Sequence, residues 1–164
     1  MFNRVVQDKM NQQIMHEMYS AYMYLSMSAQ CESANLPGFA KWLRMQADEE
    51  MEHAMKFYDF IHERGGKVTL LAIDQPPSEF GTPREIFEQV YAHEQKVTGL
   101  INSIYEVALK ENDYPSQIFL HWFIDEQVEE ESNSSQILET LKMIGESPNG
   151  LFMLDRQLGK RAEE

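Results

Sequence analysis

The sequence has one cysteine, few positive charges and no long apolar run. Cys31 is alone among 164 residues, which excludes a disulfide framework and any cysteine-rich zinc or iron–sulfur site. Its apolar runs are too short to span a bilayer, and its first residues lack the apolar core of a secretory signal. The 27 Asp and Glu against 14 Lys and Arg give a net charge of −13, which disfavours nucleic acid and anionic lipid and favours cations. We therefore expect an acidic cytoplasmic protein with no nucleic-acid or membrane partner.

Apolar residues recur at three- and four-residue spacing, the period of an α-helix, in four long segments. Thr82-Pro83-Arg84-Glu85 is a capping box with proline at the first helical position, and Ser147-Pro148 is a plausible cap and first turn. No stretch shows sustained strand alternation, so the sequence predicts an all-α chain. The helices are expected at about 4–33, 37–64, 83–112, 115–145 and, for a shorter fifth one, 148–159.

The connections between these segments predict the topology. Only a few residues separate the first two long helices and the last two, so each pair is expected to form an antiparallel hairpin. The connection 65–82 has no helical pattern, and about 17 extended residues reach about 56 Å, more than the roughly 42 Å of a 28-residue helix. The sequence therefore predicts a single domain over 1–164, a four-helix bundle with one long crossover and a short C-terminal helix.

The chain also repeats itself weakly at a constant offset. His16-Glu17 recurs 77 positions later as His93-Glu94, and the segment 48–53 recurs at the same offset as 125–130. A shared offset suggests two related hairpins that face each other about a pseudo-twofold axis. Chance matches in a Glu-rich chain are the alternative, but the matched positions are the chemically unusual ones.

Each long helix carries a stripe of residues that is apolar at both ends and polar at its centre. Each polar centre begins 11 to 13 residues after the expected start of its helix, so helices of equal length bring the centres to one height. Clustered buried carboxylates repel one another, and no Lys or Arg lies on these stripes to neutralise them. The six converging side chains are those of Glu17, Glu50, His53, Glu94, Gln127 and Glu130.

A pair of divalent cations would neutralise such a cluster, and carboxylates with one imidazole suit iron or manganese. Glu50 and His53 are three residues apart, which puts both on one face of a helix. Taken singly, each residue also fits a solvated position, and His53 fits a core histidine bonded to Glu50. The convergence of all six favours a metal centre.

Two further observations each allow both a functional and a structural interpretation. Glu126 and Glu129 lie with Glu130 on one helix face, and with Glu49 they fit a further cation site or a solvated acidic face equally well. Tyr24 lies on the stripe of Glu17, two turns away, where a buried tyrosine is more often part of the core than of a site.

At these residues the chain resembles prokaryotic non-haem ferritins, from Val5 to about Lys160. The resemblance rests on four segments, 16–24, 49–54, 93–94 and 125–131. It implies the ferritin-like four-helix bundle and an iron-storage protein with ferroxidase activity, which oxidises iron(II) with dioxygen or peroxide. It further implies that ferric oxyhydroxide mineral is deposited inside a homo-oligomeric shell of twenty-four subunits.

The resemblance also implies a role for each candidate residue. One iron would be held by Glu17, Glu50 and His53, and a second by Glu50, Glu94 and Glu130, with Glu50 bridging. Gln127 would orient dioxygen or a bound water, and Tyr24 would lie beside the centre. A third iron site would share Glu130 and add Glu49, Glu126 and Glu129.

Related families differ from this sequence in their ligand motifs. Bacterioferritins carry Glu-x-x-His on both the second and the fourth helix, whereas the fourth helix here has Gln127 and Glu130. Met51 matches their haem-ligating methionine, but non-haem ferritins can carry methionine there too, so no haem is expected. The alternatives are a di-iron oxidase or peroxidase of the same fold that stores no mineral, and a helical interaction module whose polar centre binds no metal.

Overall fold

The computed structural model describes residues 2–162, which form five α-helices and no strand. Each helix begins and ends within two residues of the expected positions, and the all-α fold class is confirmed. None of the helices in the described residues has the length and apolar character needed to cross a membrane. The single domain over 1–164 stays a prediction, of which residues 1, 163 and 164 lie outside the described part. The helices are α1 (Arg4–Ser33), α2 (Pro37–Glu63), α3 (Pro83–Lys110), α4 (Tyr114–Ile144) and α5 (Pro148–Leu158).

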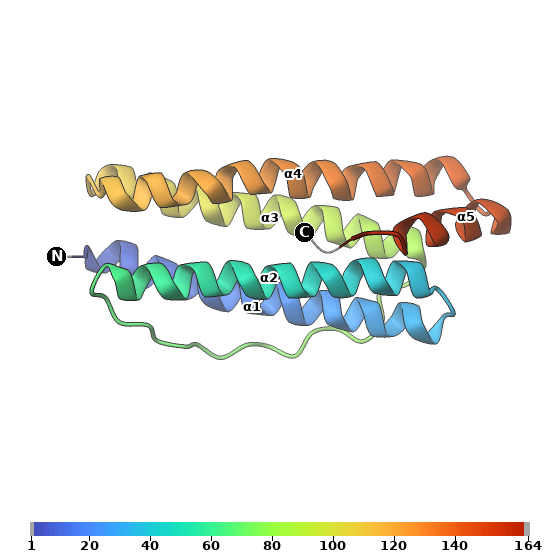
Figure 1. Ribbon diagram of the computed structural model, residues 1–164, viewed down its shortest axis with the longest axis horizontal. Helices are drawn as coiled ribbons and strands as arrows, with labels where there is room; N and C mark the ends of the chain where they lie inside the picture. The colour runs from blue at the N-terminus through green and yellow to red at the C-terminus, as the bar shows by residue number, and fades with distance from the viewer. Residues whose placement is uncertain (1, 163–164) are drawn as a thin grey trace.

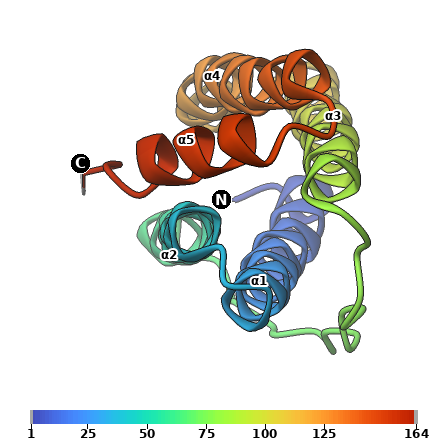
Figure 2. The same ribbon diagram turned by 90° about the vertical axis from the view of Figure 1, so that its right-hand side faces the viewer.

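The four long helices lie side by side as two antiparallel hairpins, α1–α2 and α3–α4 (Figure 1). The connection between α2 and α3 runs along the outside of the bundle from one end to the other, so α2 and α3 are parallel, as expected. Figure 2 shows this crossover beside α1 and the short α5 between α4 and α2. The bundle is therefore closed by two hairpins that pack face to face, with α5 against one end.

Side chains of α1 hold the crossover, which has no secondary structure of its own. Asn11 donates to Lys67 O at 3.0 Å and accepts from Thr69 N at 2.9 Å. Gln30 accepts from Phe80 N at 2.6 Å and donates to Gly81 O at 2.7 Å. These amide groups satisfy backbone donors and acceptors that no helix or sheet pairs. A long irregular segment is thereby ordered by the helix along which it runs.

The helix starts follow from local side-chain chemistry. Thr82 and Glu85 form the reciprocal capping box expected from the sequence, and Ser147 accepts from Gly150 N at the start of α5. At α4 the side chain of Asp113 caps Ser116 N. Because Asp113 is the cap, the helix begins at Tyr114, one residue earlier than Pro115, where the proline suggested the start.

The apolar core is divided into two halves by a polar layer. One half lies at the end where α5 packs and includes Phe39, Leu43 and Phe87. The other lies toward the opposite end and includes Phe57 and Phe123. Between them, the stripes of all four long helices change from apolar to polar at one level, and this layer holds the candidate site.

Candidate metal centre

All six side chains predicted to converge are buried in the polar layer, each 5% exposed or less. The 3.6-residue period turns each one inward from its own helix, and the matched helix lengths set them at one level. Both hairpins contribute equally, since Glu17, Glu50 and His53 belong to the first and Glu94, Gln127 and Glu130 to the second.

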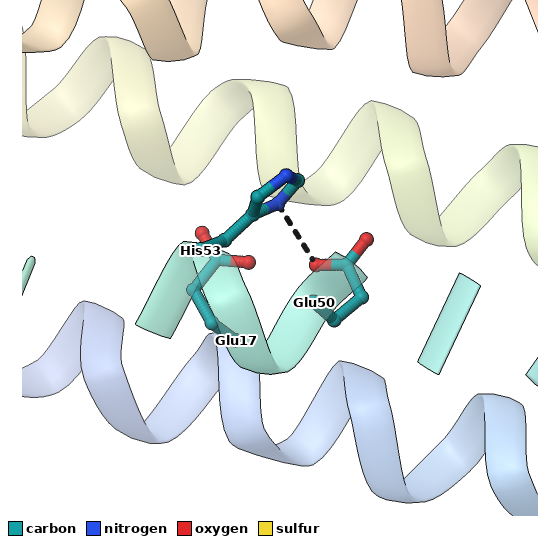
Figure 3. A group of neighbouring side chains, drawn as sticks. All are labelled: Glu17, Glu50 and His53. Atoms are coloured by element: carbon teal, nitrogen blue, oxygen red, sulfur yellow. Dashed lines mark ion pairs between the residues drawn. The ribbon is translucent and has the colours of Figure 1, made fainter. Parts of the chain in front are cut away.

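Two groups of potential ligand atoms form within this layer. In the first, Glu17, Glu50 and His53 offer atoms that all lie within 4.8 Å of one another, and Figure 3 shows Glu17 of α1 facing the α2 pair. In the second, Glu50 is joined at the same spacing by Glu94 and Glu130. Glu50 is therefore the residue that belongs to both groups and could bridge two ions. His53 Nδ1 lies 3.5 Å from Glu50 Oε2.

The side-chain amides of neighbouring glutamines donate hydrogen bonds to the carboxylates and so orient them. Gln13 donates to Glu17 Oε1 at 2.8 Å, while Glu17 Oε2 is buried without a hydrogen-bond partner among the described residues. Gln46 donates to Glu50 Oε1 at 3.3 Å and to Glu130 Oε2 at 2.7 Å. These donors each hold one oxygen of the carboxylates of Glu17, Glu50 and Glu130.

Glu94 is held by two of the predicted residues. The hydroxyl of Tyr24 donates to Glu94 Oε1, and Gln127 Nε2 donates to Glu94 Oε2 at 3.2 Å. Tyr24 is fully buried, and burial raises its pKa well above the usual range, so the phenol stays protonated as a donor. Both residues therefore position the carboxylate of Glu94, and both lie at the centre as expected.

The layer contains four buried carboxyl groups close to one another, and this shifts their pKa values. Burial, followed by the charges of neighbouring carboxylates, raises the pKa values of Glu17 and Glu50 well above their ordinary value. Burial likewise raises the pKa of Glu94 to about 7 and, with the charge of Glu94 added, that of Glu130 to about 8. Among the described residues no Lys or Arg forms an ion pair with these four glutamates. A bound cation would neutralise this charge.

The residues suggested for a third site are brought together less completely. His53 Nε2 lies 3.9 Å from Glu126 Oε1, and Glu126, Glu130 and His53 form a third group of potential ligand atoms within 4.8 Å. A hollow on the surface is lined by Glu126, Glu130 and Glu49. Glu129 is exposed and also lines this hollow, but it does not join the group of potential ligands. Glu49 faces a different partner, because both of its carboxylate oxygens accept from Arg161 Nη2 at 2.7 Å.

Two contributing residues were not assigned from the sequence. Gln46 lies on the α2 stripe, which could have indicated its inward position, but its link between Glu50 and Glu130 depends on two other helices. Arg161 follows α5 outside any periodic pattern. Only the docking of α5 on α2 brings its guanidinium to Glu49, so no local signal in the sequence could have identified it.

The donor set fits a pair of hard or borderline divalent ions. Four buried carboxylates and one imidazole supply oxygen and nitrogen ligands, and one carboxylate is shared. Glu17 Oε2 is buried without a hydrogen-bond partner among the described residues, and a metal ion bound to it would supply the partner that it lacks. Apolar clusters lie on both sides of the layer along the bundle, so ions are the partners that would neutralise it.

A four-helix bundle with one long crossover and buried glutamates contributed by all four helices is the architecture of ferritin-like proteins. The sequence profile of the ferritin-like domain matches residues 7–144. The chain therefore belongs to the ferritin family.

Individual relatives and solved structures agree along almost the whole chain. It is 41% identical over 161 residues to the bacterial non-heme ferritin of Bacteroides fragilis (strain 638R), covering 98% of this chain and 100% of that one. It is 38% identical over 162 residues to the bacterial non-heme ferritin of Staphylococcus saprophyticus, covering 99% and 97%. The open pore ferritin of the hyperthermophilic archaeon Archaeoglobus fulgidus superposes with a TM-score of 0.98 at 44% identity, covering 99% and 100%.

Proposed function

We propose that this protein stores iron and acts as a ferroxidase, oxidising iron(II) with dioxygen at the buried centre and depositing ferric oxyhydroxide inside a homo-oligomeric shell. The observation that carries the proposal is the convergence of four buried glutamates and His53 with no Lys or Arg paired to them. Membership of the ferritin family and the likeness to an archaeal ferritin support the choice of iron as the metal.

The residues of the centre are suited to take iron(II) and release iron(III) products. Glu17, Glu50 and His53 would hold one substrate ion, and Glu50, Glu94 and Glu130 the other. Carboxylates stabilise iron(III) over iron(II), which favours electron transfer to oxygen. The second position has no imidazole, so we expect iron to leave it more readily than the first.

Tyr24 and Gln127 act through Glu94 in this proposal. Their two hydrogen bonds fix the carboxylate on either side, which keeps its remaining lone pairs directed at the ion position. Glu126 adds a third ion position with His53 and Glu130, next to the hollow that Glu49 and Glu129 also line. Hydrolysis of iron(III) to oxyhydroxide releases protons, and these acidic side chains would take up part of them.

The experiment that tests this proposal is anaerobic loading of the purified metal-free protein with iron(II), then exposure to air. Iron retained per subunit is recorded on a sizing column. We expect retention far beyond a few ions, in a particle many times heavier than the 19.2 kDa chain. The variant Glu50→Gln should lose fast oxidation, whereas Glu52→Gln, at an exposed position on the same helix, should behave as the native protein.

Two outcomes would contradict the proposal in different ways. Two or three ions per subunit with no mineral would leave the metal centre but indicate a di-iron oxidase or peroxidase that stores no iron. Failure to bind iron at all would reduce the chain to a helical bundle with a vestigial polar layer.

A further inference from the structure

Arg161 lies against the acidic hollow beside the centre and is held there by four groups. Its Nη2 donates to both oxygens of Glu49 at 2.7 Å, and its Nη1 donates to Gln46 Oε1 at 3.1 Å and to Trp42 O at 3.3 Å. The guanidinium carbon lies 4.7 Å from the centroid of the Trp42 ring. Because one nitrogen binds the carboxylate, the other binds Gln46 and Trp42, and the guanidinium lies over an indole ring, the arrangement is specific and partly buried rather than a loose surface ion pair.

The segment that carries Arg161 is anchored to α2 by independent contacts. Asp155 of α5 accepts from Phe39 N at 3.0 Å, at the first turn of α2. Lys41 donates to Gly159 O at 3.1 Å. These contacts fix the chain just before Arg161, so its position at Glu49 is a consequence of how α5 docks.

The hollow beside Arg161 has a volume of about 350 Å³ and is lined by Glu49, Glu126, Glu129 and Glu130. Of these, Glu126 and Glu130 already lie with His53 at ligand spacing, whereas Glu49 is occupied by the guanidinium. The guanidinium contacts both oxygens of Glu49 and carries a positive charge, so it repels a metal ion that approaches the same carboxylate. Metal and arginine therefore compete for Glu49.

We propose that Arg161 is a resident counter-cation of the third metal position, and that a third ion gains Glu49 as a ligand only by displacing the guanidinium from it. This inference rests on the proposed function, since it presumes that the central pair of positions binds metal. Arg161 neutralises Glu49 when no third ion is present and thereby keeps the third position weaker than the central two. Filling that position releases the guanidinium from Glu49, while α5 stays docked through Asp155.

The same contacts give Arg161 a positioning role at the centre. By donating to Gln46 Oε1, it orients the amide so that Nε2 faces Glu50 and Glu130. Removal of Arg161 therefore frees Glu49 directly and also removes one contact of Gln46. The titration below measures all three ions, so an effect on the third position is distinguished from an effect on the central pair.

The test is a calorimetric titration of the metal-free full-length protein with Zn²⁺, which is not oxidised. We expect two tighter ions and one weaker ion in the native protein. In Arg161→Gln the third ion should bind on the order of tenfold tighter, since hydrogen bonds to a charged partner no longer oppose it. Arg156→Gln is the matched control, because it removes the same charge from α5 at a residue whose guanidinium faces Phe152.

A second measurement follows the arginine itself. In a Trp122→Phe background Trp42 is the only tryptophan, and its emission reports whether the guanidinium remains on its ring. We expect the third zinc ion, and not the first two, to shift this emission, and we expect no such shift after Arg161→Gln.

The outcomes separate this inference from the proposed function. A third ion that binds equally or more weakly in Arg161→Gln, or that leaves Trp42 emission unchanged in the Trp122→Phe protein that retains Arg161, would overturn the role of Arg161 alone. Fewer than two bound ions in the native protein would overturn the metal centre and this inference with it.

Discussion

Replacing Glu94 by glutamine tests whether unneutralised charge at the centre destabilises the metal-free protein. Burial is the main cause that raises the pKa of Glu94 to about 7 from an ordinary value of 4.5. One pKa unit corresponds to about 1.4 kcal/mol, so ionising this carboxyl in the folded protein costs roughly 3 kcal/mol relative to the unfolded chain. Tyr24 and Gln127 already offset part of the penalty, and the raised value includes their effect.

The sign of the effect depends on pH. A group whose pKa is raised by folding favours the folded state below its unfolded pKa, and that contribution is lost as pH rises through the folded pKa. For Glu94 the loss falls between pH 4.5 and about 7. Glutamine carries no charge over this range but cannot accept from Gln127 and Tyr24 together without rearrangement, a loss of about 1 kcal/mol.

We therefore expect metal-free Glu94→Gln to be about 1 kcal/mol less stable than the native protein at pH 4, below the unfolded pKa, and about 2 kcal/mol more stable at pH 8. The second difference corresponds to a Tm about 4–8 °C higher for a chain of this size. The assay is thermal unfolding in chelator at both pH values and one protein concentration. Glu106→Gln, on the exposed side of the same helix, is the control and should show no reversal of sign. A Tm for Glu94→Gln equal to or below the native value at pH 8 would refute the reasoning.

Three further predictions concern single contacts. Tyr24→Phe removes a donor to ionised Glu94, so metal-free stability at pH 8 should fall by about 2 kcal/mol, which denaturant unfolding would measure. Gly38→Ala would place a Cβ 1.6 Å from Asp155 O, so α5 must shift, Tm should drop by several degrees and Trp42 emission should change. His53→Ala should weaken zinc binding at the first position at least tenfold in a calorimetric titration and spare the second; equal affinity would contradict the assigned ligand.

The fold and the level of the centre could be predicted because both follow from the period of the helices. Counting along each stripe from the expected start of its helix, which the capping box at Thr82 marks for the third, predicts the height of Glu94 and of its counterparts. The direction of each side chain then followed from the apolar residues above and below it. Such information is local to each helix, so a single sequence carries it.

The surroundings of Glu49 could not be predicted in the same way. It adjoins Glu50 in the chain, but one residue rotates a helix position by about 100°, so Glu49 points out of the centre. Whether it meets a cation or an arginine depends on Arg161, which is 112 residues further along and is delivered by the docking of α5. Helix α5 can dock there only because Gly38 has no side chain, since a Cβ at this position would meet Asp155 O. The helical pattern of apolar residues gives no sign of this requirement.

The arrangement as two hairpins joined by one crossover also has a consequence for the order of folding. Each hairpin pairs helices that are adjacent in the chain, and such local pairs close faster than the contact across the long connection. We expect α1–α2 and α3–α4 to form first and to dock on each other last. Because Glu50 belongs to one hairpin and Glu94 and Glu130 to the other, the late docking step is the one that brings these carboxylates together. Metal ions present during folding should therefore accelerate the final step rather than the first.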